Sequence, residues 1–261
     1  MIIDAHAHVY PEKISNAAVQ SIADFYDIPV VNNGTLKNLL QKGDEAGIDK
    51  FLIHSVATVP AQVPNINNFL ASCLKEYPDR LIGFMAMHPQ YEDIPGEIER
   101  AMKLGMKGIK LHPDFQKFAI DDPVAYPIYE AAQGKLPILF HTGDHRYSFS
   151  EPYRLANILK KFPDLKVIGA HLGGWSQWDD AAETLSGLKN LWVDSSSTSY
   201  AMSAEKFRSL IETFGADHVL FASDYPMWFP GEELKHLQSL GLSNEEMEKI
   251  LHKNLEDLLG L

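Results

Sequence analysis

The sequence predicts an α/β protein built as a single-domain (β/α)8 TIM barrel over residues 1–261. Three observations lead to this prediction. Eight short apolar runs recur along the chain, stretches with helical spacing separate them, and each run ends in a polar or ionisable residue. A doubly wound open sheet would normally carry a glycine-rich phosphate loop after its first strand, and no such loop follows here.

The expected strands lack an alternation of polar and apolar residues, which is typical of strands buried on both faces of a parallel sheet. They cover residues 2–3, 51–53, 81–85, 108–111, 138–140, 167–170, 191–193 and 219–222. Helical spacing predicts helices over 36–46, 98–104, 152–162 and 204–214. Ser243 begins a capping box for a last helix that runs to Leu258. The long segment from Tyr10 to Thr35 is expected to cover the barrel mouth.

Composition excludes several classes of protein. Lysine plus arginine is 23 and aspartate plus glutamate is 35, and this net charge of −12 disfavours nucleic acid as a partner. The single cysteine, Cys73, excludes an internal disulfide and a multi-cysteine metal site. The chain shows no signal-peptide pattern and no run of roughly 18 apolar residues that could span a membrane. We therefore expect a cytoplasmic protein with a small molecule as its partner.

The 11 histidines are concentrated at the ends of the expected strands. Six strands end in histidine and the other two end in aspartate, namely His6, His54, His88, His112, His141, His171, Asp194 and Asp224. In a barrel these ends converge on one mouth, where active sites lie. A lone histidine after a strand is usually an ordinary loop residue, but six in register indicate one shared site. Three others, His218, His236 and His252, fall outside the pattern and are expected to be solvated or capping.

The strand ends predict a metal centre. His6 and His8 are two residues apart on a strand, so both side chains point to one face and can chelate a divalent ion. With His141 and Asp224, three nitrogens and one carboxylate oxygen suit zinc, and manganese or iron are the alternatives. Such a metal lowers the pKa of a bound water towards neutrality. We expect one ion, with Asp224 as both ligand and base and His171 as a proton-transfer residue.

Further residues are candidates for contact with substrate. Lys110 lies two residues before His112 and shares its face of the strand, where an unpaired lysine is costly. We expect Lys110 to bind an anion, and a carbamylated bridge to a second ion and a lysine that reaches the rim are the alternatives. His112 is a candidate for contact with substrate because it shares this face of the strand with Lys110. Other candidates follow strands 5, 6 and 8, namely His145, Arg146, Trp175 and Tyr225, with solvated loop or loop core as the alternative.

The combined motifs resemble the amidohydrolase superfamily, and more narrowly the amidohydrolase 2 group with its aminocarboxymuconate-semialdehyde decarboxylase-like enzymes. The motifs are His6-Ala7-His8, Phe140-His141-Thr142-Gly143, Ala170-His171-Leu172-Gly173-Gly174 and Ala222-Ser223-Asp224-Tyr225-Pro226. The resemblance runs from residue 2 to the C-terminal helix. It implies one divalent metal bound by His6, His8, His141 and Asp224, with a catalytic histidine at His171. It is also compatible with a homodimer.

The resemblance leaves the reaction open, because some relatives hydrolyse amides, esters or lactones and others remove carbon dioxide without oxidation. We expect a metal-dependent hydrolase of a small, carboxylate-bearing molecule. A non-oxidative decarboxylase with the same metal site is the alternative, and a non-catalytic barrel that binds metal or ligand is a third hypothesis. The decarboxylases are usually longer, with larger loops at the mouth. Two-metal relatives carry a carbamylated lysine on the strand that holds Lys110. Phosphoesterase barrels with the same first motif add a histidine after the strand-end aspartate, whereas Tyr225 follows Asp224.

Overall fold

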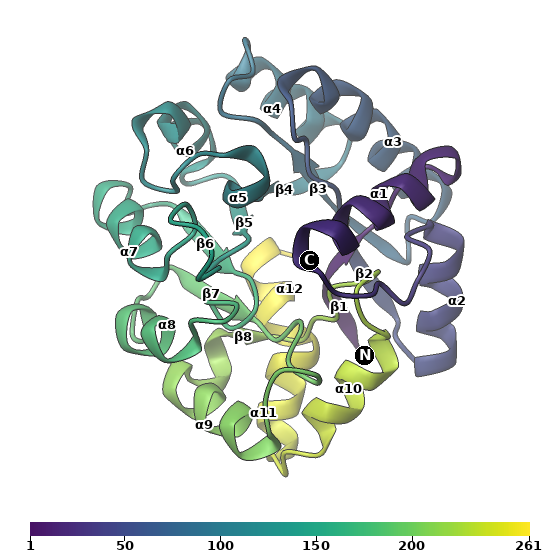
Figure 1. The fold of residues 1–261 in the computed structure, drawn as a ribbon, viewed down its shortest axis with the longest axis vertical. Coiled ribbons are helices and arrows are strands. Elements are labelled where there is room, and N and C mark those ends of the chain that lie inside the picture. The colour runs from purple at the N-terminus through teal and green to yellow at the C-terminus, as the bar shows by residue number, and fades with distance from the viewer.

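The computed structural model describes residues 1–261 and contains one sheet of eight parallel strands in chain order. They are β1 (Ile3–His8), β2 (Lys50–His54), β3 (Leu81–Ala86), β4 (Met106–Leu111), β5 (Pro137–Phe140), β6 (Lys166–Gly169), β7 (Leu191–Asp194) and β8 (Val219–Leu220). The amides of Ala5 and His8 donate to the carbonyls of Phe221 and Tyr225, which joins β1 to the segment after β8. The sheet therefore closes into a ring, and the expected barrel is confirmed (Figure 1).

The helices surround the strands as an outer layer (Figure 1). They are α1 (Glu12–Tyr26), α2 (Leu36–Ala46), α3 (Val63–Glu76), α4 (Ile94–Lys103), α5 (Pro113–Gln116), α6 (Tyr126–Ala132), α7 (Pro152–Lys161), α8 (Trp178–Leu185), α9 (Ala204–Phe214), α10 (Pro230–Gln238), α11 (Asn244–Glu248) and α12 (Asn254–Leu259). Both bounds of α2 and α9 match the predicted helices. The fourth helix begins earlier than predicted, because Asp93 caps it by accepting from the amide of Gly96. The last predicted helix is divided by a π-helical turn, Lys249–Lys253.

An apolar layer fills the interior of the barrel below the polar strand ends. It includes Ile3, Leu52 and Ile82, and Leu255 and Leu258 of α12 pack against it. Figure 1 shows α12 behind the centre of the ring. Each fully buried Leu or Ile side chain contributes roughly 1.5–3 kcal/mol to the stability of the fold. One end of the barrel is thus filled with apolar side chains, and the polar residues gather at the other end.

The first helix lies at this polar end. Its C-terminal residues reach the loops after β4 and β5, with the Phe25 ring 4.4 Å from the Phe115 ring and the Tyr26 hydroxyl 2.9 Å from His112 Nε2. The segment from Tyr10 to Thr35 therefore covers part of the mouth, as the sequence indicates.

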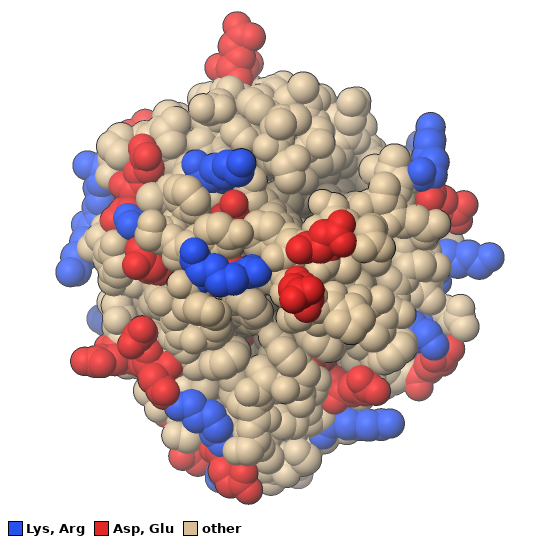
Figure 2. Space-filling view, in the orientation of Figure 1, with Lys and Arg blue, Asp and Glu red and all other residues tan.

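The outer surface gives two further observations. None of the helices combines the length and the hydropathy that crossing a membrane requires. Figure 2 shows lysine, arginine, aspartate and glutamate side chains interspersed around the edge of the face in view, and charged side chains of both signs also lie near its middle.

Candidate metal centre

The strand ends meet in one buried polar cluster. Its members expose less than a tenth of their surface and come from β1, β2 and β4 to β8 or the residues just after them: His6, His8, His54, Lys110, His112, His141, His171, Asp194 and Asp224. His88, at the end of β3, is also buried, but its Nδ1 accepts from the backbone amide of Gln90. Apart from His88, the strand-end residues therefore lie together although they are distant in the sequence, and their role as one functional site stays a prediction.

Three ligand atoms face one another at the centre of this cluster. His6 Nε2 lies 3.2 Å from His8 Nε2, and Asp224 Oδ1 lies 3.4 Å from the first nitrogen and 3.5 Å from the second. Metal bonds of 2.0–2.2 Å in tetrahedral geometry separate neighbouring ligand atoms by about 3.3 Å. Two imidazoles and a carboxylate at these separations fit one divalent ion.

Asp194 sets the tautomer of His6 that suits metal binding. Its Oδ2 accepts a hydrogen bond from His6 Nδ1 at 2.8 Å, so the proton lies on Nδ1 and the lone pair of Nε2 faces the centre. Burial alone would raise the pKa of Asp194, but the adjacent His6 and His171 hold that pKa well below its ordinary value. The carboxyl is therefore ionised and fixes the tautomer that binds metal. The sequence indicated Asp194 only as a strand-end residue.

The same aspartate orients a second pair of imidazoles. Ser196 donates to Asp194 Oδ1, so its oxygen accepts from His171 Nδ1 at 2.8 Å. His171 Nε2 is then left without a proton and lies 3.1 Å from His141 Nδ1. These two nitrogens can share one proton or hold a second divalent ion.

The structure places His141 differently from the expected ligand set. Its Nδ1 faces His171, and its Nε2, which is buried without a hydrogen-bond partner, lies 3.8 Å from Asp114 Oδ2. Its ring stacks on His112 with centroids 4.0 Å apart. The nitrogens of His112 are both bonded within the protein, since Nδ1 accepts from the Phe115 amide and Nε2 contacts Tyr26. His112 thus positions Tyr26, and the role of His141 as a ligand of the first ion stays a prediction.

Lys110 lies inside the cluster and not at the rim. It is 1% exposed, and its Nζ is 3.2 Å from His6 Nε2. Burial lowers the pKa of Lys110 to about 8, against the opposing effect of Asp194 and Asp224. Because a buried ammonium needs a counter-charge, this position suits an anionic ligand group.

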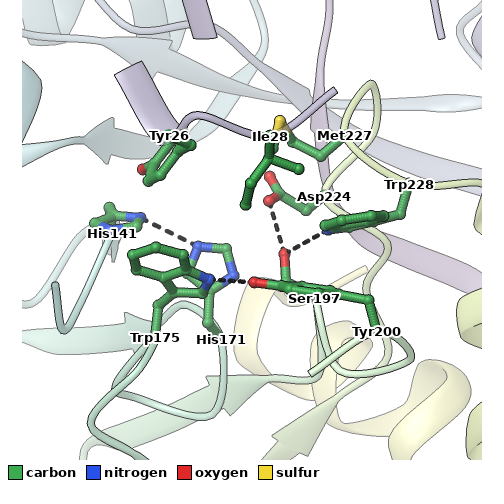
Figure 3. A pocket seen from close by; sticks show the side chains of 10 residues that line it. All are labelled: Tyr26, Ile28, His141, His171, Trp175, Ser197, Tyr200, Asp224, Met227 and Trp228. Carbon is green, nitrogen blue, oxygen red and sulfur yellow. Dashed lines mark hydrogen bonds between the residues drawn. The ribbon is translucent and has the colours of Figure 1, made fainter. Parts of the chain in front are cut away.

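A narrow cavity, about 240 Å³ including the part that is open to solvent, adjoins the cluster (Figure 3). Its lining residues are Tyr26, Ile28, His141, His171, Trp175, Ser197, Tyr200, Asp224, Met227 and Trp228. Asp224 Oδ2 accepts from Ser197, whose oxygen in turn accepts from Trp228 Nε1. Tyr200 stacks on Trp228 with centroids 4.1 Å apart and accepts from Trp175 Nε1 at 2.6 Å. These bonds tie the polar edges of the aromatic side chains to one another.

Three residues expected to contact substrate have other partners. Arg146 donates from Nε and Nη2 to Asp144 and from Nη1 to the carbonyl of Phe25, so it ties the end of α1 to the loop after β5. His145 is exposed and bonded to Ser176. Tyr225 is fully buried, and its hydroxyl donates to the carbonyl of Thr35 at 3.0 Å. The contacts of all three fix loops, and none of the three lines the cavity.

Glu233 of α10 has a positioning role that the sequence did not indicate. It is 2% exposed and accepts hydrogen bonds from the backbone amides and the hydroxyls of Thr198 and Ser199. These bonds hold the loop that carries Ser197 and Tyr200 to the cavity. The donors lie 34 or 35 residues away in the chain, so no local pattern could have predicted the contact.

We expect Glu233 to make stability depend on pH. Burial raises the pKa of this carboxyl from 4.5 to about 7, although bonds from Ser199 and Thr198 oppose the shift. The folded state therefore binds the proton more tightly, and the free energy of unfolding falls as pH rises from 4.5 to 7. In Glu233→Gln this loss of about 3 kcal/mol should be absent. Urea denaturation of both proteins at several pH values checks this, and parallel pH profiles would contradict it.

The fold and the site together define a metal-binding (β/α)8 barrel enzyme. The chain belongs to the amidohydrolase family, because the model of that family matches residues 3–261. The resemblance seen in the motifs is thereby confirmed.

Solved structures share the fold over the full length. The 5-carboxyvanillate decarboxylase of Sphingomonas paucimobilis has a TM-score of 0.77 and 18% identity, over 100% of this chain and 99% of that one. The dihydroxybenzoic acid decarboxylase of a Polaromonas species was solved with bound manganese and the inhibitor 2-nitroresorcinol. It has a TM-score of 0.77 and 18% identity, over 100% of this chain and 97% of that one. The 2,6-dihydroxybenzoate decarboxylase of Rhizobium has a TM-score of 0.75 and 16% identity, over 99% of this chain and 98% of that one.

Proposed function

We propose that the protein is a metal-dependent lyase that removes carbon dioxide, without oxidation, from a small planar carboxylic acid. The observation that carries the proposal is the cavity, in which aromatic side chains lie beside Asp224 and His171 (Figure 3). A planar acid can stack on such walls, and an apolar wall favours loss of the charged carboxylate. The full-length similarity to decarboxylases supports this alternative over the expected hydrolysis.

The ion would be held by His6, His8 and Asp224. Manganese gains support from the bound manganese in the Polaromonas enzyme, and zinc gains support from the nitrogen-rich donor set. When bound, such an ion supplies a Lewis acid that polarises an oxygen of the substrate. Metal analysis of the purified protein distinguishes the two.

Residues of the chain would bind the anionic group of the substrate, deliver a proton and accept a proton. Lys110 offers its ammonium to the anionic group of the substrate. The bond between carbon and carboxylate breaks, its electron pair stays on carbon, and a proton takes the place of the departing carbon dioxide. We assign delivery of that proton to His171, which lines the cavity: its Nε2 takes up a proton from solvent before each turnover, and Asp194 and Ser196 stabilise the protonated ring. Asp224, oriented by Ser197, accepts the proton of a substrate hydroxyl.

The partner is then a small acid and not a polyanion. The net charge of −12 and the mixed charges around the face in Figure 2 support this part of the proposal.

Hydrolysis is the second candidate, and one observation favours it. The nitrogens of His141 and His171 face each other at 3.1 Å, and Lys110 lies in the same cluster. A second ion at this pair would give a two-metal centre of the kind that activates water for attack. Carbamylation of Lys110 would supply the shared ligand.

The test is a pair of substrate panels on the purified protein loaded with manganese or with zinc. Release of carbon dioxide from hydroxybenzoic or enoic acids, with the ring or alkene carbon protonated, is the expected result. Cleavage of amides, esters or lactones without carbon dioxide release would favour hydrolysis instead. Turnover of neither panel, with metal bound, would contradict both reactions.

A further inference from the structure

Asp4 of β1 is a buried carboxylate that joins the two segments carrying His6 and Asp224. It is 0% exposed. Its Oδ1 accepts from the backbone amides of His6 at 3.1 Å and Ser223 at 3.0 Å. Its Oδ2 accepts from the Ser223 hydroxyl at 2.5 Å. One side chain therefore bridges β1 and the segment after β8, and both of these segments carry expected metal ligands.

On the β1 side, Asp4 bonds to the chain where the strand is irregular. The register of β1 with β2 shifts between Asp4 and Ala7, and the amide of His6, within this interval, is the one that donates to Asp4. Irregularities of this kind change the direction in which a side chain points. The bond to Asp4 thus holds the backbone at the residue whose ring faces the centre.

On the other side, Asp4 holds the peptide groups around Asp224. The φ of Asp224 is +62°, in the left-handed region that favours glycine, and a residue with a side chain persists there when its surroundings hold it. The Ser223 amide donates to Asp4, and the Ser223 hydroxyl both donates to Asp4 and accepts from the Tyr225 amide at 3.1 Å. The Asp224 amide donates to the carbonyl of His6 at 2.9 Å. The peptides before and after Asp224 are therefore both fixed.

We propose that Asp4 is a positioning residue for the metal centre, which acts through Ser223 on the direction of the Asp224 side chain. Asp224 Oδ1 lies 3.4 and 3.5 Å from the Nε2 atoms of the two β1 histidines, and the bonds to Asp4 keep it there. The inference rests on the proposed metal centre and adds a residue outside the ligand set. A carboxylate that only closed the barrel between β1 and β8 would affect stability alone, whereas a positioning residue also affects the bound ion.

The experiment loads the purified protein with Co²⁺ and titrates it with a chelator to obtain the Kd of the ion. The visible absorption of Co²⁺ reports the geometry of its ligands. Asp4→Ala should raise Kd by about 10–100-fold and change the absorption, as expected when a residue that orients a ligand is lost. Asp4→Asn should stay within about threefold of wild type, because its amide oxygen still accepts from both backbone amides.

Glu97→Ala is the matched control. Glu97 of α4 is a carboxylate that is 5% exposed and accepts from Asn67 and Arg100. It resembles Asp4 in burial and bonding but lies in the outer layer of helices. Its removal should lower the free energy of unfolding and leave the Kd and the absorption unchanged. If folded Asp4→Ala shows this same pattern, Asp4 only closes the barrel and the proposal is overturned. Equal losses of affinity in Asp4→Ala and Asp4→Asn would also overturn it, since the charge and not the bonds would then be responsible.

Ser223→Ala covers the case in which Asp4→Ala does not fold. It removes only the hydroxyl between Asp4 and the Tyr225 amide, so Kd should rise by about tenfold, the lower end of the range, with a changed absorption. An unchanged Kd and absorption would contradict the proposal. A wild type that binds Co²⁺ but releases no carbon dioxide would overturn the proposed reaction alone, because Kd still decides the role of Asp4. A wild type that binds no Co²⁺ would overturn both.

Discussion

Replacing Asp224 by asparagine is expected to lower the rate of carbon dioxide release by about 10²–10⁴-fold. The amide keeps the shape of the side chain but loses the negative charge that faces His6 and His8 at 3.4 and 3.5 Å. It also loses the basic oxygen that Ser197 orients. Steady-state kinetics at saturating metal, with metal content measured on the same samples, separates the loss of proton acceptance from the loss of the ion.

Asp217→Asn is the matched control for this change. Asp217 carries the same carboxylate, but its side chain is largely exposed and pairs with Lys249 at 2.8 Å on the surface. Its replacement should leave the rate within twofold of wild type, since exposed ion pairs contribute roughly 0–1 kcal/mol. If Asp224→Asn keeps both its metal and its full rate, the assignment of Asp224 fails.

Lys110→Met should lower kcat/KM for an anionic substrate by about 10–100-fold, the loss of one charge-assisted hydrogen bond. Methionine matches the length of the lysine stem, so packing in the barrel is retained while the ammonium is removed. Because the ammonium is buried beside His6, its removal should not lower the free energy of unfolding. Kinetics and urea denaturation on the same variant test the two parts of this prediction.

Lys107→Met, on the same strand β4, is the control, because Lys107 is exposed and its side chain points away from the barrel interior. Equal losses in the two variants would show that the effect is not specific to the buried lysine. Loss of one bound metal ion in Lys110→Met, with the other retained, would instead identify Lys110 as a carbamylated bridge and support hydrolysis.

The sequence predicted the parts of the molecule that depend on local pattern. Apolar runs located all eight strands, and the residues that follow them located the cluster, because parallel strands bring their ends to one mouth. Helical spacing located both ends of Leu36–Ala46 and Ala204–Phe214, and the structure shows that Thr35 and Ser203 cap these helices by accepting from amides within the first turn.

The sequence could not predict the orientations of the side chains in the cluster. His171 faces His141 because Ser196 and the ionised Asp194, which lie at the end of another strand, hold the His171 ring. Glu233 and Arg146 act through partners far along the chain or on the backbone, and neither contact leaves a periodic signal. The sequence shows that Arg146 is charged, which made it a candidate for binding an anion. It does not show that the N–H groups of Arg146 already donate hydrogen bonds within the protein.

The bond between Arg146 and the carbonyl of Phe25 holds the end of α1 against the wall of the cavity. The guanidinium is surrounded by the rings of Phe25, Tyr26, Tyr147 and Trp175, at 5.0–5.5 Å from their centroids. Tyr26 and Trp175 also line the cavity. A movement of α1 that widens the mouth therefore removes part of the wall that a substrate would stack on. The segment that covers part of the mouth thus also lines the cavity, so a planar acid bound there would contact the cover itself.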